Sequence, residues 1–173
     1  MHKLFMERSS LLTVWAVAWM VIASPFVYAG LSSLDKSCLS PHKQKSIAEK
    51  TLRAIVQSHG QWLEQRYNQN YHRADLCLAD LRKAALNGAN LERANLEGAN
   101  LRHANLYQIT LAHAHLAGAD FTKAGLEDGN LSGADMRQAR LSQANLFRVI
   151  GDEAALFNGV LVGTQLHESS FER

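Results

Sequence analysis

The sequence predicts an all-β repeat fold in which the backbone bends once every five residues around an apolar interior. A large apolar side chain recurs at every fifth position from Leu76 to Phe171, and Gly151 is the exception. A small residue, usually Ala, stands two positions earlier, and Asp or Asn often lies between them, as in Ala94-Asn95-Leu96. The two positions after the apolar residue vary among polar types, so we expect them to face water.

A period of five fits neither standard element. On an α-helix, five residues advance about 500°, so successive apolar side chains precess by roughly 140° and no single face is apolar. On a straight strand, an odd period places alternate apolar side chains on opposite faces. The chain must therefore bend once per repeat. Ala suits a crowded inner corner, and Asp or Asn suits a bend because its side chain hydrogen-bonds nearby backbone.

This Ala-Asp/Asn-Leu-X-X pattern resembles the pentapeptide-repeat family, and the resemblance covers residues 74–173. It implies a solenoid, the right-handed quadrilateral β-helix, in which each repeat forms one side of a square and four repeats form a coil. About five coils would stack at a strand-like spacing of about 4.8 Å. Side chains four repeats apart in sequence are then expected above one another. Stability would come from stacking, because a single coil cannot bury its leucines.

Residues 1–29 are typical of an export signal. Basic residues are followed by an apolar run, Leu11–Ala23, and by the small-x-small sequence Val27-Tyr28-Ala29. The apolar run is short for a membrane-spanning helix, which needs about 20 residues. We therefore expect cleavage and a periplasmic or secreted protein. The alternative is an uncleaved membrane anchor formed by residues 11–29, which would be the only membrane contact.

Residues 30–73 are expected to form a helical leader that caps the first coil. Ser40 is a plausible N-cap with Pro41 at the first helical position, and the helix is expected to end near Gly60. A second short helix would start at Gln61. The apolar face of the first helix would consist of Ile47, Leu52, Ile55 and Val56.

The run His59-Gly60-Gln61-Trp62-Leu63 looks like a leader that precedes the repeats in some members of the family. By that resemblance, Trp62 and Leu63 would cover the exposed leucines of the first coil. A solenoid needs such a cap, because its open end exposes apolar core and unpaired backbone.

Two cysteines in an exported chain favour one disulfide, between Cys38 and Cys77. Cys77 directly follows Leu76, so it is expected to point outward, where the leader can reach it. Closing a loop of about 40 residues stabilises a fold by roughly 4 kcal/mol in the chain-entropy model. The alternative is two unrelated free thiols.

The repeat decays after Gly151, and the chain ends two residues after Phe171, so no cap is expected at this end. Val160 and Val162 stand where earlier repeats carry polar groups, and Phe157 is also in an outward position. Two interpretations remain open. The last coil either stacks on a second copy to form a homodimer, through Phe157, Val160, Val162 and Phe171, or is a frayed terminus.

Stacking of the coils would gather the outward residues into columns, and two faces of the predicted rod stand out. One face, the basic face, collects Arg82, Lys83, Arg102, His103 and Lys123, with Asp80 and Asp120 beside them. It is interpreted either as a surface for an acidic partner or as a solvated face partly neutralised by its own aspartates. The other, the aromatic face, carries Tyr107, Phe147 and His167, which form either a contact surface or an ordinary scatter of exposed aromatics.

The sequence lacks the nucleophile-elbow, phosphate-loop and zinc-protease motifs, so we predict no enzymatic activity. His113 and His115 could share a metal, but no cysteine or carboxylate completes a familiar ligand spacing. No metal or cofactor is therefore predicted.

The family resemblance also implies an alternative function. Strongly acidic members mimic duplex DNA and bind a type II topoisomerase such as gyrase, which confers quinolone resistance. The repeats here hold twelve acidic residues against nine Lys and Arg, and DNA mimicry requires denser negative charge. The export signal also argues against it. We therefore expect no nucleic acid partner and predict a non-enzymatic scaffold for an unidentified envelope protein.

Overall fold

The computed structural model describes residues 38, 41–65 and 72–172. The chain divides into two compact units, Met1–Lys36 and Ser37–Arg173. The predicted export signal, the cleavage site and the alternative anchor at 11–29 all lie outside the described residues, as do parts of the leader. Within the described ranges, no helix combines the length and apolar character that crossing a membrane requires.

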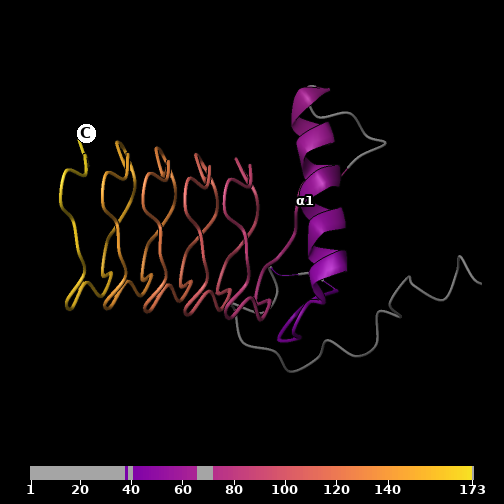
Figure 1. Ribbon diagram of the computed structural model, residues 1–173, viewed down its shortest axis with the longest axis horizontal. Coiled ribbons are helices and arrows are strands. Elements are labelled where there is room, and N and C mark those ends of the chain that lie inside the picture. Colours follow the sequence, from indigo (N-terminus) through magenta and orange to yellow (C-terminus); the bar gives the residue numbers. More distant parts are fainter. Residues whose placement is uncertain (1–37, 39–40, 66–71, 173) are drawn as a thin grey trace, which may run out of the picture. The chain divides into compact units, whose positions relative to one another are not determined.

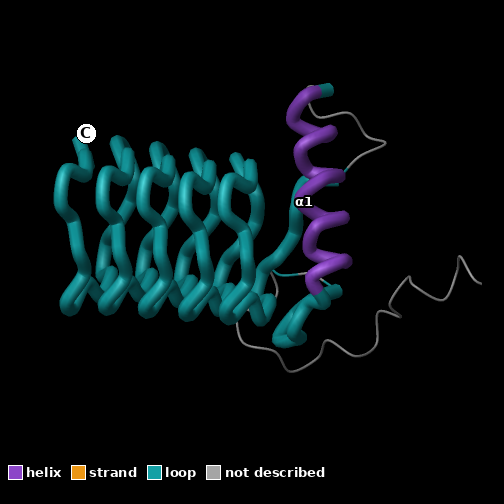
Figure 2. The backbone as a smooth tube through the Cα atoms, viewed as in Figure 1, coloured by secondary structure: helices purple, strands orange, loops and turns teal. Residues whose placement is uncertain are grey.

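The repeats form stacked coils (Figure 1). Parallel β-bridges join residues that are 20 apart, from Asp75 and Asn95 at one end to Ile150 and Ser170 at the other. Each side of a coil contributes one bridged residue. For example, the Leu81 amide donates to the carbonyl of Asn100 (2.8 Å), and the Asn100 amide donates to that of Ala79 (2.9 Å). Because the sides are this short, the coils are drawn as loops in Figure 2.

The corners lie at the two variable positions after the apolar residue, and not at the Asp or Asn where a bend was expected. A tight turn is closed by the Ala84 amide donating to the carbonyl of Leu81 (3.0 Å). The second variable residue has positive φ, 59° at Lys83 and 60° at Lys123, as at the third position of a type II turn. The Asp or Asn side chain supports this turn, since Asp120 Oδ1 accepts the Thr122 amide hydrogen (2.9 Å).

The apolar residues fill the interior through most of the rod. Leu76, Leu91 and Leu146 are fully buried, and the small residues two positions before the apolar ones are buried with them in the inner coils. Burial fails in the last coil, where Leu161 is 38% exposed and Leu166 is 43% exposed. The predicted core is therefore confirmed up to the last coil, which has no further coil stacked on it.

Gly151, the one interior position without an apolar side chain, is filled from the next coil. A Cβ atom added to Gly151 would overlap the Phe171 ring. Phe171 lies 20 positions after Gly151, so it occupies the same side one coil further along. An aromatic ring thus stacks directly on the smallest interior residue.

The leader contains a single helix, α1 (Glu49–Glu64). It begins after Ala48 without a side-chain cap, and it continues through Gly60, so both the predicted start at Pro41 and the predicted division into two helices are wrong. The segment before it pairs with the first coil. Lys43 bridges Ala79, and Ser46 bridges Asp80. The two bridged residues and the turn between them, in which Gln44 has a φ of 53°, occupy residues 42–46, so the helix starts later.

The face that α1 turns to the core matches the prediction in part. Leu52 is 4% exposed, and Ile55 and Val56 pack against the same cluster, whereas Ile47 packs there from the segment before the helix. Trp62 and Leu63 are only half-buried and are not among the described residues that pack on the leucine core, which corrects their expected role. His59, which sequence reasoning placed in the leader without a role, is fully buried.

Candidate functional surfaces

The basic face is formed as the repeat register predicts. Its five residues, Arg82, Lys83, Arg102, His103 and Lys123, are all exposed. The backbone stacks them, since the Lys83 amide donates to the carbonyl of Arg102 (3.0 Å) and the His103 amide donates to that of Thr122 (3.1 Å). A shallow groove of about 560 Å³ runs between them and the leader; it is lined by Ser46, Asp80, Arg82, Lys83, Asn100, Arg102 and His103. Sequence reasoning missed Ser46, because only the 42–46 pairing brings it there.

The two arginines of the basic face are partly neutralised. Arg82 donates two hydrogen bonds to the carboxylate of Asp80, one from Nε (2.9 Å) and one from a terminal nitrogen (2.8 Å). These bonds hold the pKa of the Asp80 carboxyl below its usual value. Arg102 lies 3.7 Å from a carboxylate oxygen of Asp120.

The lysines of the basic face are different. Among the residues that the structure describes, no ion pair involves Lys83 or Lys123. Both occupy the left-handed corner position, and so does His103 between them. Lys83 and Lys123, with His103 stacked between them, are therefore the part of the basic face whose lysine charges have no ion-pair partner among the described residues.

The aromatic face is less continuous than its sequence register suggests. Tyr107 is 43% exposed, but Phe147 is half-buried, with the Arg148 guanidinium 5.1 Å above its ring. Glu127 occupies the same column between the two aromatics and accepts a hydrogen bond from Asn145 Nδ2 (2.6 Å). A carboxylate thus interrupts the predicted apolar surface. His167, one coil beyond Phe147, is exposed.

The structure pairs Cys38 with Cys77. Their Cα atoms are 5.8 Å apart, within the range that a disulfide spans, and 39 positions separate them in sequence. Both residues are buried, at 3% and 0% exposure. Cys77 occupies an outward position of the repeat as expected, and its burial shows that other residues cover it.

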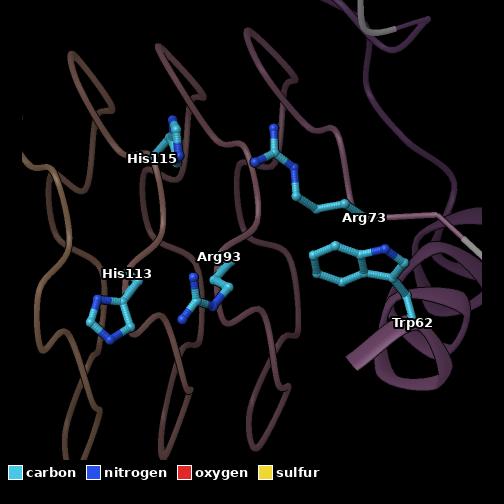
Figure 3. A pocket seen from close by; sticks show the side chains of 5 residues that line it. All are labelled: Trp62, Arg73, Arg93, His113 and His115. Atoms are coloured by element: carbon cyan, nitrogen blue, oxygen red, sulfur yellow. The ribbon is translucent and has the colours of Figure 1, made fainter. Parts of the chain in front are cut away.

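A second groove, which no sequence pattern indicated as a unit, lies beside α1 (Figure 3). It has a volume of about 480 Å³ and is lined by Trp62, Arg73, Arg93, His113 and His115. His113 and His115 face this groove, and no cluster of three or more metal-ligating side chains occurs in the part of the chain that the structure describes. The register alone could have placed Arg93 above His113, but only the fold brings Trp62 to them.

The last coil exposes apolar side chains. Phe157 is 64% exposed, Val160 42% and Val162 71%, and Ile150 is half-exposed nearby. Phe171, predicted with them as a contact residue, is instead partly buried against the core.

The stacked coils, the leucine interior and the charged outer columns define a solenoid repeat protein. The family model for pentapeptide repeats matches residues 68–98, 99–138 and 130–173, in eight copies. The chain therefore belongs to the pentapeptide-repeat family, whose fold is the right-handed quadrilateral β-helix. No enzyme family is indicated.

Several solved structures are similar to this chain. A pentapeptide repeat protein of the Arabidopsis thaliana thylakoid lumen is 27% identical, with a TM-score of 0.51, over 58% of this chain and 70% of that one. QnrB1, a plasmid-mediated fluoroquinolone resistance protein, is 20% identical (TM-score 0.45, 53% and 46% covered). A pentapeptide repeat protein from Nostoc is 23% identical (TM-score 0.37, 74% and 78% covered). No curated protein sequence matches this chain significantly.

Proposed function

We propose that this protein is a non-enzymatic, exported scaffold whose basic face docks an acidic segment of a partner protein in the periplasm or cell envelope. The observation that carries the proposal is the column Lys83, His103 and Lys123, which is exposed and stacked one coil apart. A repeated spacing of positive charge on a stiff backbone suits an extended acidic chain, because electrostatic complementarity favours both encounter and register.

Two observations support an exported location. The sequence begins with a signal-like segment, and the two cysteines are paired at bonding distance, which is the arrangement favoured in oxidising compartments. The Arabidopsis relative is a lumenal protein. The alternative function, DNA mimicry toward a topoisomerase, requires a continuous acidic surface, and the basic face interrupts any such surface on this rod.

The decisive experiment combines a defined probe with capture from cells. Binding of a polyglutamate peptide to the full chain is measured first, and then crosslinking is carried out in the native envelope fraction, with the cytosolic fraction as control. The test variant is Lys83→Glu/Lys123→Glu. The matched control, Lys50→Glu/Arg53→Glu, reverses the same number of charges on exposed positions of α1.

We expect the test variant to lose the peptide and one defined envelope protein with an acidic segment, while the control variant keeps both. Equal binding by both variants would show that the basic face is not the docking site. Recovery of a topoisomerase from the cytosolic fraction would overturn both the location and the rejection of DNA mimicry.

A second proposal concerns assembly, and the exposed apolar residues of the last coil favour it. Phe157, Val160 and Val162 would meet the same residues of a second copy, so that the two exposed ends cover each other. Such an end-to-end contact also extends the interior leucine stack across the interface. Sedimentation analysis tests this. A dimer that becomes a monomer with Val162→Lys supports the contact, and a monomeric wild-type chain at micromolar concentration contradicts it.

A further inference from the structure

The groove beside α1 combines one aromatic wall with four nitrogen-rich side chains (Figure 3). Trp62 comes from the last turn of the helix, Arg73 from the position directly before the first repeat, and Arg93 and His113 from successive coils of one side. His115 comes from the adjoining side. Three separate parts of the fold therefore converge on one depression of about 480 Å³.

The composition of the lining favours an anion. Two guanidinium groups and two imidazoles line the groove, and no carboxylate is among its lining residues in the described structure. Glu92 is bonded to Arg93 Nε (3.3 Å) but does not line the groove. Arginine presents several N–H donors in a planar fork that matches phosphate and carboxylate oxygens, and an imidazole N–H adds a further donor.

An acidic group, Asp135, lies on the adjoining side and is hydrogen-bonded to an arginine. Asp135 lies one coil below His115 and is held by Arg137, through Nε (2.8 Å) and a terminal nitrogen (2.6 Å). These bonds keep the pKa of the Asp135 carboxyl below its usual value. Asp135 is thus paired with Arg137, and its charge also interacts with His115 of the groove.

The positions of the groove residues are set by the backbone. Arg93 (φ 60°) and His113 (φ 55°) both occupy left-handed corners one coil apart, and their stacking is fixed by the bond from the Arg93 amide to the carbonyl of Ala112 (2.8 Å). Gly133 follows in the same column, and the His113 ring lies over it, where a side chain would collide. Trp62 is steadied by its stacking on buried His59, with ring centroids 5.5 Å apart.

We propose that this groove binds a small phosphorylated molecule with a planar ring, the phosphate meeting Arg73 and Arg93 and the ring packing on Trp62. The volume lies within the range of about 300–1,000 Å³ that small-molecule sites occupy. This inference goes beyond the scaffold function, since it uses a different surface and a different ligand class from the basic face.

Calorimetric titration of the full chain tests it with three probes. Adenosine monophosphate carries ring and phosphate, ribose 5-phosphate lacks the ring, and adenosine lacks the phosphate. The test variant is Arg73→Gln/Arg93→Gln. The matched control, Arg53→Gln/Arg140→Gln, removes two exposed arginines outside the groove. Thermal unfolding of each variant checks that the fold is intact.

We expect adenosine monophosphate to bind best, and its affinity to fall about tenfold or more in the test variant but not in the control. Equal affinity for ribose 5-phosphate would overturn the role of the ring, and equal affinity for adenosine would overturn the role of the phosphate. Binding that is absent in the wild type, or that survives in the test variant, would overturn the site.

Discussion

His59 links the leader to the repeats, because its side chain hydrogen-bonds backbone groups that in later coils are paired with other backbone groups. Its bond to the carbonyl of Glu92 is the clearest case. The imidazole Nε2 donates to the carbonyl of Glu92 (2.9 Å). One coil further on, the equivalent carbonyl, that of Ala112, accepts the Arg93 amide hydrogen instead (2.8 Å). The other ring nitrogen, Nδ1, accepts the Ala74 amide hydrogen (3.1 Å). A neutral side chain with the proton on Nε2 satisfies both groups.

Replacement of His59 by Phe is expected to destabilise the protein by about 2–4 kcal/mol, because the ring is kept while a buried N–H and a buried C=O lose their partners. His59→Asn restores an acceptor near Nδ1 and should recover part of the loss. Chemical denaturation measures both, with the exposed His167→Ala as the control. If Phe and Asn are equally destabilising, the hydrogen bond to Ala74 contributes nothing measurable.

Lowering the pH is expected to reduce the free energy of unfolding, because His59 is protonated more readily in the unfolded chain. Burial lowers the pKa of His59 below its ordinary value, because the charged imidazolium is poorly solvated there. At a pH below about 6.5 the unfolded chain binds a proton that the folded chain does not. This contribution to stability is therefore complete above that pH and is lost as the pH falls below it.

Unfolding free energies measured from pH 7.5 to pH 5 in wild type and in His59→Asn check the pH dependence. The wild type should lose more stability over this range than the variant. Parallel curves would mean that His59 is not the titrating group. The lowered pKa values of Asp80 and Asp135 act in a separate, more acidic range, and both proteins share them.

Restoring the repeat at Gly151 is expected to harm the protein. Gly151→Leu gives the consensus interior residue, but the Phe171 ring already fills that space, so overpacking should cost about 1–3 kcal/mol. Adding Phe171→Leu to this variant should recover most of the loss. Thermal unfolding of both single variants and the double variant measures the coupling. Additive effects would show that the two residues do not share one site.

Loss of the bond between Cys38 and Cys77 is expected to lower stability by about 4 kcal/mol, given a loop of about 40 residues. The double variant Cys38→Ser/Cys77→Ser is compared with the wild type in urea, with and without reductant. Reductant should destabilise the wild type and leave the variant unchanged. If complete reduction of the disulfide leaves the stability of the wild type in urea unchanged, a structural role for the disulfide is contradicted.

The repeat residues determine most of this fold from sequence. A period of five, with a small residue two positions before each large apolar one, allows little except a chain that bends once per repeat around leucines, because helix and strand both scatter the apolar side chains. The stacking of Lys83, His103 and Lys123 follows from that register. So does the place of the weak end, since Val160 and Val162 break the polar pattern.

The bounds of the helix in the leader could not be predicted from local sequence patterns, because they depend on contacts with segments far away in the sequence. Ser40-Pro41 resembles a helix start, but pairing of residues 42–46 with the first coil prevails, because it satisfies backbone groups at the edge of the coil. Gly60 resembles a helix end, but α1 continues past it to Glu64, and Trp62 on one side of the glycine stacks on the buried ring of His59 on the other.

The sequence alone therefore determined the coil, its interior and the columns of charge, because each follows from a short repeat whose neighbours in space are set by a constant offset. Only the tertiary structure decided that His59 hydrogen-bonds the carbonyl of Glu92 and that Trp62 lines one groove with Arg93 and His113. These relationships join residues of no fixed spacing, so they depend on where distant segments pack and not on any periodic signal.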